Sequence, residues 1–306
     1  MFNFVQRRRI YFLVSATIIG VGLVAMIIST VRTGLPFLIG VDFQSGTRFE
    51  VQFMEAVNEN EIREVFNDFG VANPSVTSLA GENLENAWQI RSESLTPEET
   101  NDIQAALSER VAPLVPGATR VESVSASIAA EVTRAAFVAV LVSAIIVLFY
   151  IMFVFRQMPH PFRYGASAVI AMLHDILIIF GFIAVTGLLL GWEVDALFLT
   201  AALTVAGFSL QDTIVVFDRI RENTRRYPLE DYEMLVNRSV LETIHRSLAT
   251  QLNAMFVLSA ILLFGGASIR HFIAVLFIGL LSGTYSSLCN AVPLLVTWEK
   301  RAAEVA

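Results

Sequence analysis

Charged residues are scarce in this sequence. Only 16% of its 306 residues are Asp, Glu, Lys or Arg, whereas 55% are hydrophobic, and the mean hydropathy is +0.63. Soluble domains carry about 25% charged residues, so this composition excludes an ordinary soluble protein and predicts a membrane protein. The net charge is −7. Because nucleic-acid binding requires a basic surface, we expect no nucleic-acid partner.

Cysteine is nearly absent as well. The single cysteine, Cys289, lies inside an apolar stretch. One cysteine excludes an intrachain disulfide and a cysteine-based metal site. We expect Cys289 to act as a small buried apolar residue, and we expect the protein to hold no metal ion and no other cofactor.

Long apolar runs take the place of charge. A membrane helix needs about 20 apolar residues, and the runs that reach this length are 10–31, 135–155, 166–190, 196–217, 248–266 and 271–297. The first run follows Arg7, Arg8 and Arg9, but it exceeds the roughly 7–15 residues of a signal-peptide core and no cleavage site follows it. We therefore expect a bundle of six membrane helices, the first one retained.

Arginine and lysine gather in alternate loops. They precede the first run, separate the second from the third and the fourth from the fifth, and follow the last run, whereas the other short loops carry Glu193, Asp195 and Arg270. Basic loops stay in the cytoplasm. We therefore expect a multi-pass protein of the cytoplasmic membrane with both termini in the cytoplasm.

A polar segment, 33–134, separates the first two runs and would lie outside the cytoplasm. The chain thus divides into an N-terminal segment with the first membrane helix (1–32), this outer domain (33–134), and five membrane helices with a cytoplasmic C-terminus (135–306). The outer domain is acidic and has no Lys, His, Cys or glycine-rich phosphate loop. These absences favour a binding or spacer domain, and we expect no catalytic residues and no enzymatic activity.

Strand and helix patterns alternate in the outer domain. Strands are predicted at 47–54, 74–80, 87–92 and 119–128, with a turn at 81–86 between the middle two. Helices are predicted at 58–70 and at 96–111, where Thr96 is the cap and Pro97 the first residue. The order βαββαβ is typical of the split ferredoxin-like fold. The predicted fold class is therefore an all-α six-helix membrane bundle with an inserted α+β domain.

Asp212 lies within the fourth apolar run. A charge at the bilayer centre costs about 2.5–3.5 kcal/mol on insertion scales, so such a residue is a functional candidate by default. In the fifth run, Arg246, Thr250 and Asn253 form a polar stripe at i, i+4 and i+7,. Arg246 enters the membrane at the depth of Asp212.

These side chains predict a proton path. A carboxyl group in a low-dielectric environment favours its neutral form, whereas a nearby guanidinium favours the charged form. Movement of Arg246 relative to Asp212 would therefore bind or release a proton. His174 and Asp175, at a similar depth in the third run, are further candidates.

Three other interpretations of these residues remain open. Arg246 could extend to the membrane surface, and Asp212 could be a structural hydrogen-bond partner. Asp175 and Asp212 could also form the acid–base pair of an intramembrane aspartyl protease. That family requires Tyr-Asp and Gly-x-Gly-Asp, where this chain has His-Asp and Leu-Gln-Asp.

In the sixth run, Gly279, Gly283 and Ser286 form a ridge of small residues that predicts a closely packed neighbouring helix, from this chain or another.

Four sequence blocks occur in a fixed order: GVDFQSGTRFEV (40–51), LHD (173–175), GFSLQDTIVVFDRIREN (207–223) and TIHRSLAT (243–250). With six spans and a domain after the first, they make the whole chain resemble the SecF family of SecD/SecF protein-export membrane proteins, which is related to the resistance-nodulation-division transporters. The first block is matched by Gly40, Asp42, Phe43 and Gly46. The resemblance places the proton-pathway Asp, Arg and Thr of the family on Asp212, Arg246 and Thr250.

Two positions depart from the family pattern. Ser45 replaces the first glycine of a Gly-Gly pair, and because Gly tolerates a positive φ that Ser does not, the turn there could differ. Gln211 replaces an Asn, and it is a longer amide with the same donors and acceptors.

The resemblance also implies a function and partners. The chain would pair with SecD, whose own six spans would complete a twelve-helix pseudo-symmetric transporter. The complex would join the SecYEG channel and act on emerging preproteins at the outer face, driven by protons. The alternatives are one half of a proton-coupled small-molecule exporter of the resistance-nodulation-division class, and a structural membrane scaffold.

Overall fold

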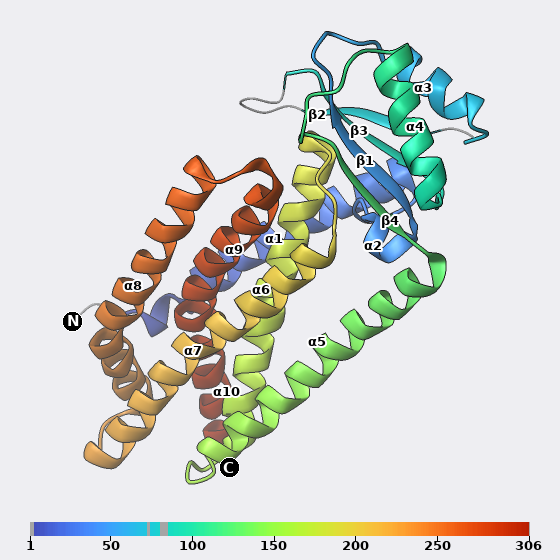
Figure 1. The fold of residues 1–306 in the computed structure, drawn as a ribbon. Helices are drawn as coiled ribbons and strands as arrows, with labels where there is room; N and C mark the ends of the chain where they lie inside the picture. Colours follow the sequence, from blue (N-terminus) through green and yellow to red (C-terminus); the bar gives the residue numbers. More distant parts are fainter. Residues whose placement is uncertain (1–2, 72–73, 80–84, 306) are drawn as a thin grey trace. The chain divides into compact units, whose positions relative to one another are not determined.

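The computed structural model describes residues 3–71, 74–79 and 85–305, and Figure 1 labels its elements. The chain forms two compact units. The first contains residues 1–37, 138–188 and 197–306, and the second contains residues 38–137 and 189–196. The short loop 189–196 therefore belongs to the same unit as the segment that follows the first helix.

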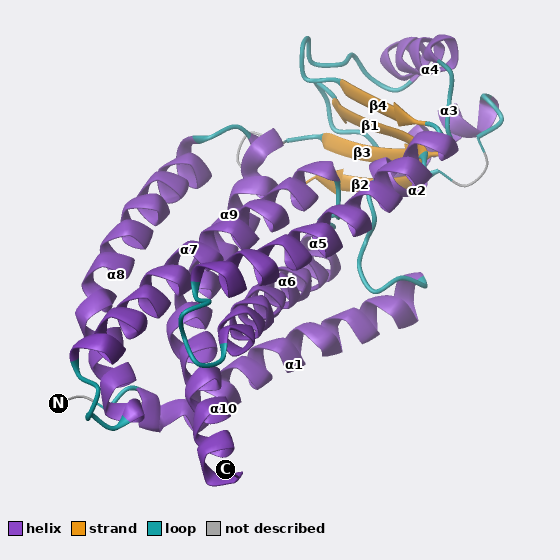
Figure 2. Cartoon of the chain, turned by 90° about the horizontal axis from the view of Figure 1, so that it is seen from below, coloured by secondary structure: helices purple, strands orange, loops and turns teal. Residues whose placement is uncertain are grey.

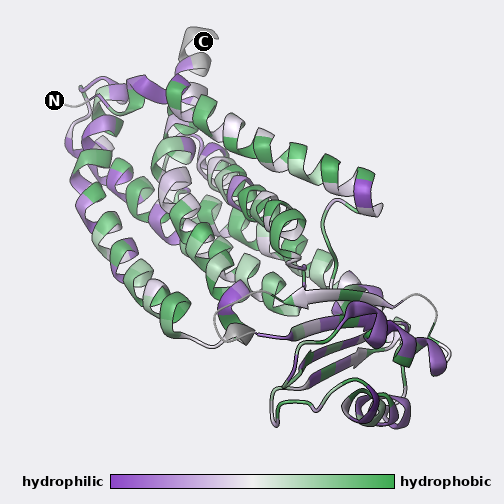
Figure 3. Cartoon of the chain, turned by 90° about the horizontal axis from the view of Figure 1, so that it is seen from above, coloured by the Kyte–Doolittle hydropathy of each residue, from purple (hydrophilic) through white to green (hydrophobic). Residues whose placement is uncertain are grey.

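The first unit consists of long apolar helices. They are α1 (Arg8–Thr33, after the 3₁₀ turn η1, Val5–Arg7), α5 (Ala126–Val154), α6 (Pro161–Leu190), α7 (Ala196–Arg226), α8 (Tyr232–Phe264), and α9 (Ala267–Ser286), which continues through the π-helical segment η2 (Ser287–Ala291) into α10 (Val292–Val305). Among the described residues, six stretches are long and apolar enough to cross a membrane, which confirms the six predicted spans. In Figure 3 these helices are coloured mostly as hydrophobic residues.

The helices are longer than their apolar runs. Helix α7 continues to Arg226, and α8 begins at Tyr232, where the side chain of Asp231 accepts hydrogen bonds from the amides of Glu233 and Met234. An acidic cap of this kind satisfies free amides and interacts favourably with the helix dipole.

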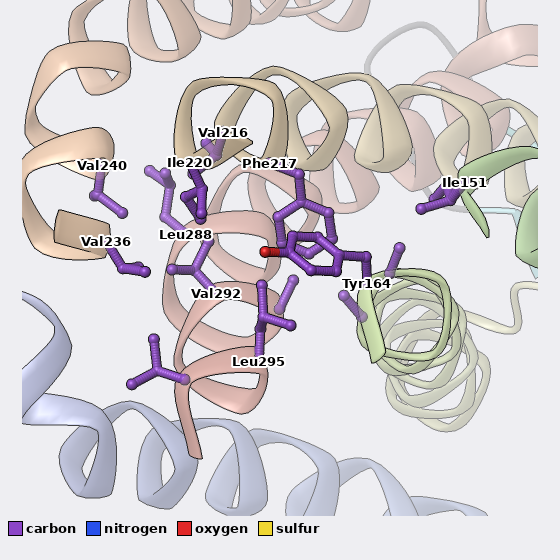
Figure 4. Packing of buried hydrophobic residues seen from close by; sticks show 14 of the residues in the cluster. Ile151, Tyr164, Val216, Phe217, Ile220, Val236, Val240, Leu288, Val292 and Leu295 are labelled. Carbon is purple, nitrogen blue, oxygen red and sulfur yellow. The ribbon is translucent and has the colours of Figure 1, made fainter. Parts of the chain in front are cut away.

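Apolar side chains from several helices fill the centre of this unit. The rings of Phe155 and Tyr164 stack, and Phe217 meets both edge to face, with ring centroids 5.2–6.0 Å apart. Figure 4 shows this packing, with Leu288 and Val292 of the last span between α7 and α8. The last span is thus largely covered by protein, and Cys289 within it is buried, as the sequence predicts.

Glycines allow two close helix approaches. The Cα of Gly181 on α6 lies 2.7 Å from the position that a Cβ on Gly22 of α1 would occupy. On the last span, a Cβ on Gly279 would lie 2.2 Å from Val205, and one on Gly283 would lie 3.2 Å from Ser209. The ridge predicted from small residues therefore packs on α7 of the same chain.

The second unit is built on a four-stranded antiparallel sheet, coloured orange in Figure 2. The element order is α2 (Val41–Gln44), β1 (Gly46–Gln52), α3 (Glu59–Asp68), β2 (Ser75–Leu79), β3 (Ala87–Ser92), α4 (Pro97–Arg110) and β4 (Arg120–Val124). The strands lie in the order β2-β3-β1-β4. The four predicted strands and both predicted helices are present, with capping boxes at Asn58 and Thr96.

Two local predictions need comment. The predicted turn at 81–86 falls largely outside the described residues. The prediction of a strand continuing to 128 was wrong, because β4 ends at Val124 and α5 begins at Ala126. The carbonyl of Ser125 already accepts the amide of Ala129 at 3.0 Å, which starts the helix.

Ser45 occupies a backbone conformation that suits glycine. Its φ and ψ are 65° and 161°, a region that is essentially restricted to glycine and costs about 1–3 kcal/mol for other residues. The following Gly46 has φ 127°, and a Cβ there would lie 2.6 Å from the carbonyl oxygen of Ser92. The tight turn between α2 and β1 is therefore kept despite the serine.

We expect Ser45→Gly to stabilise the second unit by about 1 kcal/mol, because glycine removes the strain at this position. Hydrogen exchange of the β1 amides in the full-length chain measures the effect. The control is Ser75→Gly at the start of β2, which relieves no strain and should destabilise. Equal or weaker protection of β1 in Ser45→Gly would contradict the assignment of strain.

Candidate functional site

Helix α7 positions two buried polar side chains one turn apart. Ser209 and Asp212 are 2% and 4% exposed. Residues three apart share a helix face and lie about 4.5 Å apart along the axis. Each of the two contacts a different neighbouring helix, so α7 links two polar clusters within the helix bundle.

Asp212 is held by a neutral partner from α8. The side-chain amide of Gln251 donates a hydrogen bond of 2.8 Å to Oδ2 of Asp212, and both residues are buried. Within the described part of the chain, no ion pair joins Asp212 to Arg246. The predicted stripe of Arg246, Thr250 and Asn253 is exposed in this chain.

A different polar stripe of α8, not the one that contains Arg246, faces the interior of the bundle. Thr243, Ser247 and Gln251 follow at i, i+4 and i+8, and all three are buried. Residues at this spacing share one helix face. The signal was present in the sequence, but it consists of uncharged residues, whereas the stripe with Arg246 attracts attention because it contains a charge.

Asp175 is the centre of the second cluster. It is fully buried, and its carboxylate accepts hydrogen bonds of 2.6 Å each from Ser209, Ser282 and Ser286. Oδ1 also lies 3.1 Å from Nδ1 of His174. Helices α6, α7 and α9 therefore meet at one carboxylate whose acceptor positions are filled.

His174 extends this cluster to α1. Its Nε2 lies 3.1 Å from Oγ of Ser15, and that hydroxyl also contacts the amide of Asn290 in η2, with distances of 3.0 Å to Oδ1 and 2.9 Å to Nδ2. On the other side, the His174 ring lies 6.3 Å from the ring of Tyr285. The π-helical turn thus places Asn290 beside α1, and such turns are frequent at functional sites.

The group to which the Ser15 hydroxyl donates its hydrogen bond depends on the protonation of His174. A hydroxyl has one proton to donate. If Ser15 donates to Asn290, Nε2 must carry a proton to keep its contact, and with Nδ1 donating to Asp175 the ring is then doubly protonated. If Ser15 donates to Nε2, the ring is neutral. Either form of His174 keeps its hydrogen bond to Ser15, but with the neutral ring Ser15 no longer donates to Oδ1 of Asn290 and is held by Nδ2 of that amide alone.

The two carboxyl groups occupy separate clusters. Asp175 is bonded by serines and His174, and Asp212 by Gln251. In the described residues, no hydrogen bond links Asp175 and Asp212. A shared proton between two adjoining carboxyls, which an aspartyl protease requires, therefore has no counterpart in this arrangement.

The block after the first span lies in the second unit, where it binds the α6–α7 loop. The amide of Gly40 donates to the carbonyl of Val194 at 2.7 Å. The carboxylate of Asp42 accepts the amide of Ala196, the first residue of α7, at 2.9 Å. The carbonyl of Phe43 accepts the hydroxyl of Thr133 at 3.3 Å. Gly40 and Asp42 thus hold the start of α7.

Glu193 anchors the same loop to the sheet. Its carboxylate accepts the amide of Gln89 at 2.8 Å and lies 3.2 Å from Arg91 and 3.6 Å from Arg48. Burial raises the pKa of Glu193 above its ordinary value, although Arg91 and Arg48 act in the opposite direction. This role could not be predicted from sequence patterns, because Glu193 is distant along the chain from β1 and β3.

The raised pKa of Glu193 has a defined effect on stability. Because the folded state binds this proton more tightly than the unfolded state, the contribution of Glu193 is largest in acid and falls as pH rises from the ordinary pKa through the raised one,. We expect Glu193→Gln to remove this fall. Hydrogen exchange of β1 and β3 amides at several pH values measures it, with Glu122→Gln as the control. An unchanged pH profile in Glu193→Gln would contradict the prediction.

Among the described residues, no group of three or more His, Cys, Asp or Glu side chains could hold a metal ion. What the helix bundle offers instead is a pair of buried carboxyl groups with neutral and basic partners. Such groups can take up and release protons, and Asp212 has both an amide and a guanidinium on the same neighbouring helix.

Comparison with known proteins places these features in one family. The family model described as "Protein export membrane protein SecD/SecF, C-terminal" matches residues 105–301. The chain is 39% identical over 302 residues to the Protein translocase subunit SecF of Anaerolinea thermophila, covering 98% of this chain and 94% of that relative. It is 30% identical to the Protein translocase subunit SecDF of Bacillus subtilis, over 98% of this chain but 38% of the relative.

A solved structure gives the same result. The crystal structure of SecDF, a translocon-associated membrane protein from Thermus thermophilus, superposes with a TM-score of 0.79 at 28% identity, over 98% of this chain and 39% of that chain. The whole chain therefore corresponds to a part of the SecDF proteins and to nearly all of the separate SecF subunits.

Proposed function

Because this chain belongs to the SecD/SecF family of protein-export membrane proteins, as a SecF-type translocase subunit, we propose that it uses the proton-motive force to assist protein translocation through the Sec pathway. In this proposal Asp212 binds the proton and Arg246 drives its release. Thr250, one turn after Arg246 on the same stripe, lines the path.

The observation that carries the proposal is the neutral partner of Asp212. The carboxyl is buried and bonded to the amide of Gln251, while Arg246, five residues earlier on α8, faces outward. An amide accommodates either protonation state of a carboxyl group, whereas a guanidinium favours the anion. Rotation of α8 that replaces Gln251 by Arg246 would therefore release the proton.

The membrane potential supplies enough energy for such a step. One charge crossing 100 mV contributes about 2.3 kcal/mol. Since 1.4 kcal/mol corresponds to a factor of ten, this biases a two-state equilibrium roughly 50-fold. Asp175 and His174 would provide a second position for a proton, beside Ser209 and about one helical turn from Asp212,.

The loop 189–196 suggests how the step reaches the outer domain. It joins α6, which carries Asp175, to α7, which carries Asp212. The loop is bound to Gly40 and Asp42, which precede β1, and through Glu193 to the sheet. A shift of α6 or α7 would therefore act on the sheet through the loop. The strand order β2-β3-β1-β4 supports a ferredoxin-like fold for this domain.

Contacts at one end of the bundle support the proposed orientation. Glu233, at the start of α8, contacts Arg8 of α1 and Lys300 of α10. The N-terminal end of α1 and the C-terminal end of α10 therefore lie together, as expected if both termini are in the cytoplasm. This end also carries the basic loops, which would place it on the cytoplasmic side of the cytoplasmic membrane.

We further propose that the partner is SecD. The chain covers 38% and 39% of two SecDF proteins, and the proposed partner would correspond to the part that it does not cover. The exposed face of α8 with Arg246 is a surface that a SecD subunit could cover. The complex would act with SecYEG on translocating preproteins.

The experiment that tests the proposal is secretion into inverted membrane vesicles that lack this chain. Re-addition of the chain with its partner should stimulate translocation, and dissipation of the proton gradient should abolish the stimulation. Stimulation that persists without a gradient would contradict the proposal and favour a structural scaffold. Export of small molecules without any effect on secretion would favour the exporter.

A further inference from the structure

A basic pocket lies between the end of α5 and the extension of α7 beyond its apolar part. It has a volume of about 310 Å³ and is lined by Phe153, Val154, Arg156, Gln157, Arg221 and Arg225. The two helix ends that form it can be followed in Figure 1. Its lining contains three arginines and no acidic side chain, which indicates an anionic ligand.

The three arginines differ in how far their charge is balanced. Arg221 forms an ion pair with Asp218 and donates to the carbonyl of Val154 at 3.2 Å. Arg225 donates to the neutral amide of Gln157, and the guanidinium of Arg156 lies 4.6 Å from the ring centroid of Phe153. Within the described residues, neither Arg156 nor Arg225 has a carboxylate partner. The pocket therefore carries uncompensated positive charge.

The pocket adjoins an apolar surface. Ile146, Phe149 and Phe153 lie on one face of α5, and they are 61%, 62% and 64% exposed. Val154 is the last residue of this membrane-spanning helix. The stripe therefore runs along the hydrocarbon region and ends at the arginines, where lipid headgroups lie.

From this juxtaposition we propose that the pocket binds the phosphate of an anionic phospholipid, with an acyl chain along the α5 stripe. Arginine guanidinium groups pair with phosphate in a bidentate manner, and basic pockets between membrane helices on the cytoplasmic side are suited to anionic headgroups. Free phosphate would satisfy the arginines but would leave the apolar stripe unused. The inference is independent of proton transport.

Native mass spectrometry of the full-length chain in detergent tests the proposal. Phosphatidylglycerol is titrated, with phosphatidylcholine as the zwitterionic lipid of zero net charge. We expect binding of phosphatidylglycerol at least tenfold tighter, and a loss of about tenfold in the double variant Arg156→Gln/Arg225→Gln. The control Arg9→Gln/Arg226→Gln removes the same charge from the same end of the bundle and should change binding less than twofold.

Three outcomes would overturn the proposal. They are an equal loss in the control pair, equal binding of phosphatidylcholine, and complete displacement of the lipid by an equal concentration of inorganic phosphate, which would identify a free-phosphate site. If the double variant fails to fold, a photoreactive phosphatidylglycerol on the unmodified chain replaces it. Its crosslinks should map to 146–157 or 221–225, and crosslinks only elsewhere would refute the site.

Discussion

Asp212→Asn is expected to leave membrane insertion and assembly intact and to abolish the proton-dependent stimulation of secretion. An amide keeps the size of the side chain and a hydrogen bond to Gln251, which binds the carboxyl at 2.8 Å, but it cannot exchange a proton. The variant should lose the bias of its conformational equilibrium, which is roughly 50-fold for one charge that crosses a potential of 100 mV. Secretion into inverted vesicles, with and without a proton gradient, measures it.

Asp218→Asn is the matched control on the same helix. Asp218 is more than half exposed and pairs with Arg221, and exposed ion pairs contribute about 0–1 kcal/mol. We expect this variant to retain stimulation. Arg246→Met should resemble Asp212→Asn, because without the guanidinium nothing expels the proton. Full stimulation in Asp212→Asn would remove Asp212 from the mechanism.

Gly22→Leu should detach α1 from the bundle and destabilise it by about 3 kcal/mol, the upper part of the range for overpacking. A Cβ on Gly22 would lie 2.7 Å from the Cα of Gly181. Backbone cannot move aside as a flexible side chain can, so the helices must separate, and Ser15 would lose its contacts with His174 and Asn290. Unfolding in mixed micelles with a denaturing detergent measures the change.

Gly20→Leu offers a control two residues away. A Cβ on Gly20 meets nothing within 4 Å, so the same substitution in the same helix should be nearly neutral or slightly stabilising, since glycine is a poor helix former. Equal destabilisation by both variants would show that a leucine anywhere in this part of α1, and not the loss of the Gly22–Gly181 contact, accounts for the effect.

The periodicity of the sequence was sufficient to predict most of the fold. Apolar runs predict the six spans because a bilayer requires length and hydrophobicity alone. The strands and helices of the second unit could be predicted from hydrophobic alternation and from caps such as Thr96. Helix ends were less predictable, as α8 begins at Tyr232 through its Asp231 cap. The binding of the 189–196 loop to the sheet could not be predicted, because Glu193 meets β1 and β3 only in three dimensions.

The site was predicted in part. Charge and hydropathy identified Asp212, Asp175 and His174, because polar residues in membrane helices are rare. Charge and hydropathy could not show that Ser209 donates a hydrogen bond to Asp175 or that Gln251 donates one to Asp212. These contacts depend on how each helix is rotated about its axis, which its neighbours determine. The roles of Asp212, Arg246 and Thr250 in proton transfer remain predictions.

The most direct measurement is the infrared spectrum of the carboxyl groups in the purified complex, recorded as pH is varied. We predict a band of a protonated carboxylic acid whose intensity follows pH, which Asp212→Asn removes and Asp218→Asn preserves. Arg246→Met should preserve the band, because Gln251 still binds the carboxyl and no guanidinium drives release of its proton. A pH-dependent carboxyl band that is identical in the unmodified protein and Asp212→Asn would contradict the account.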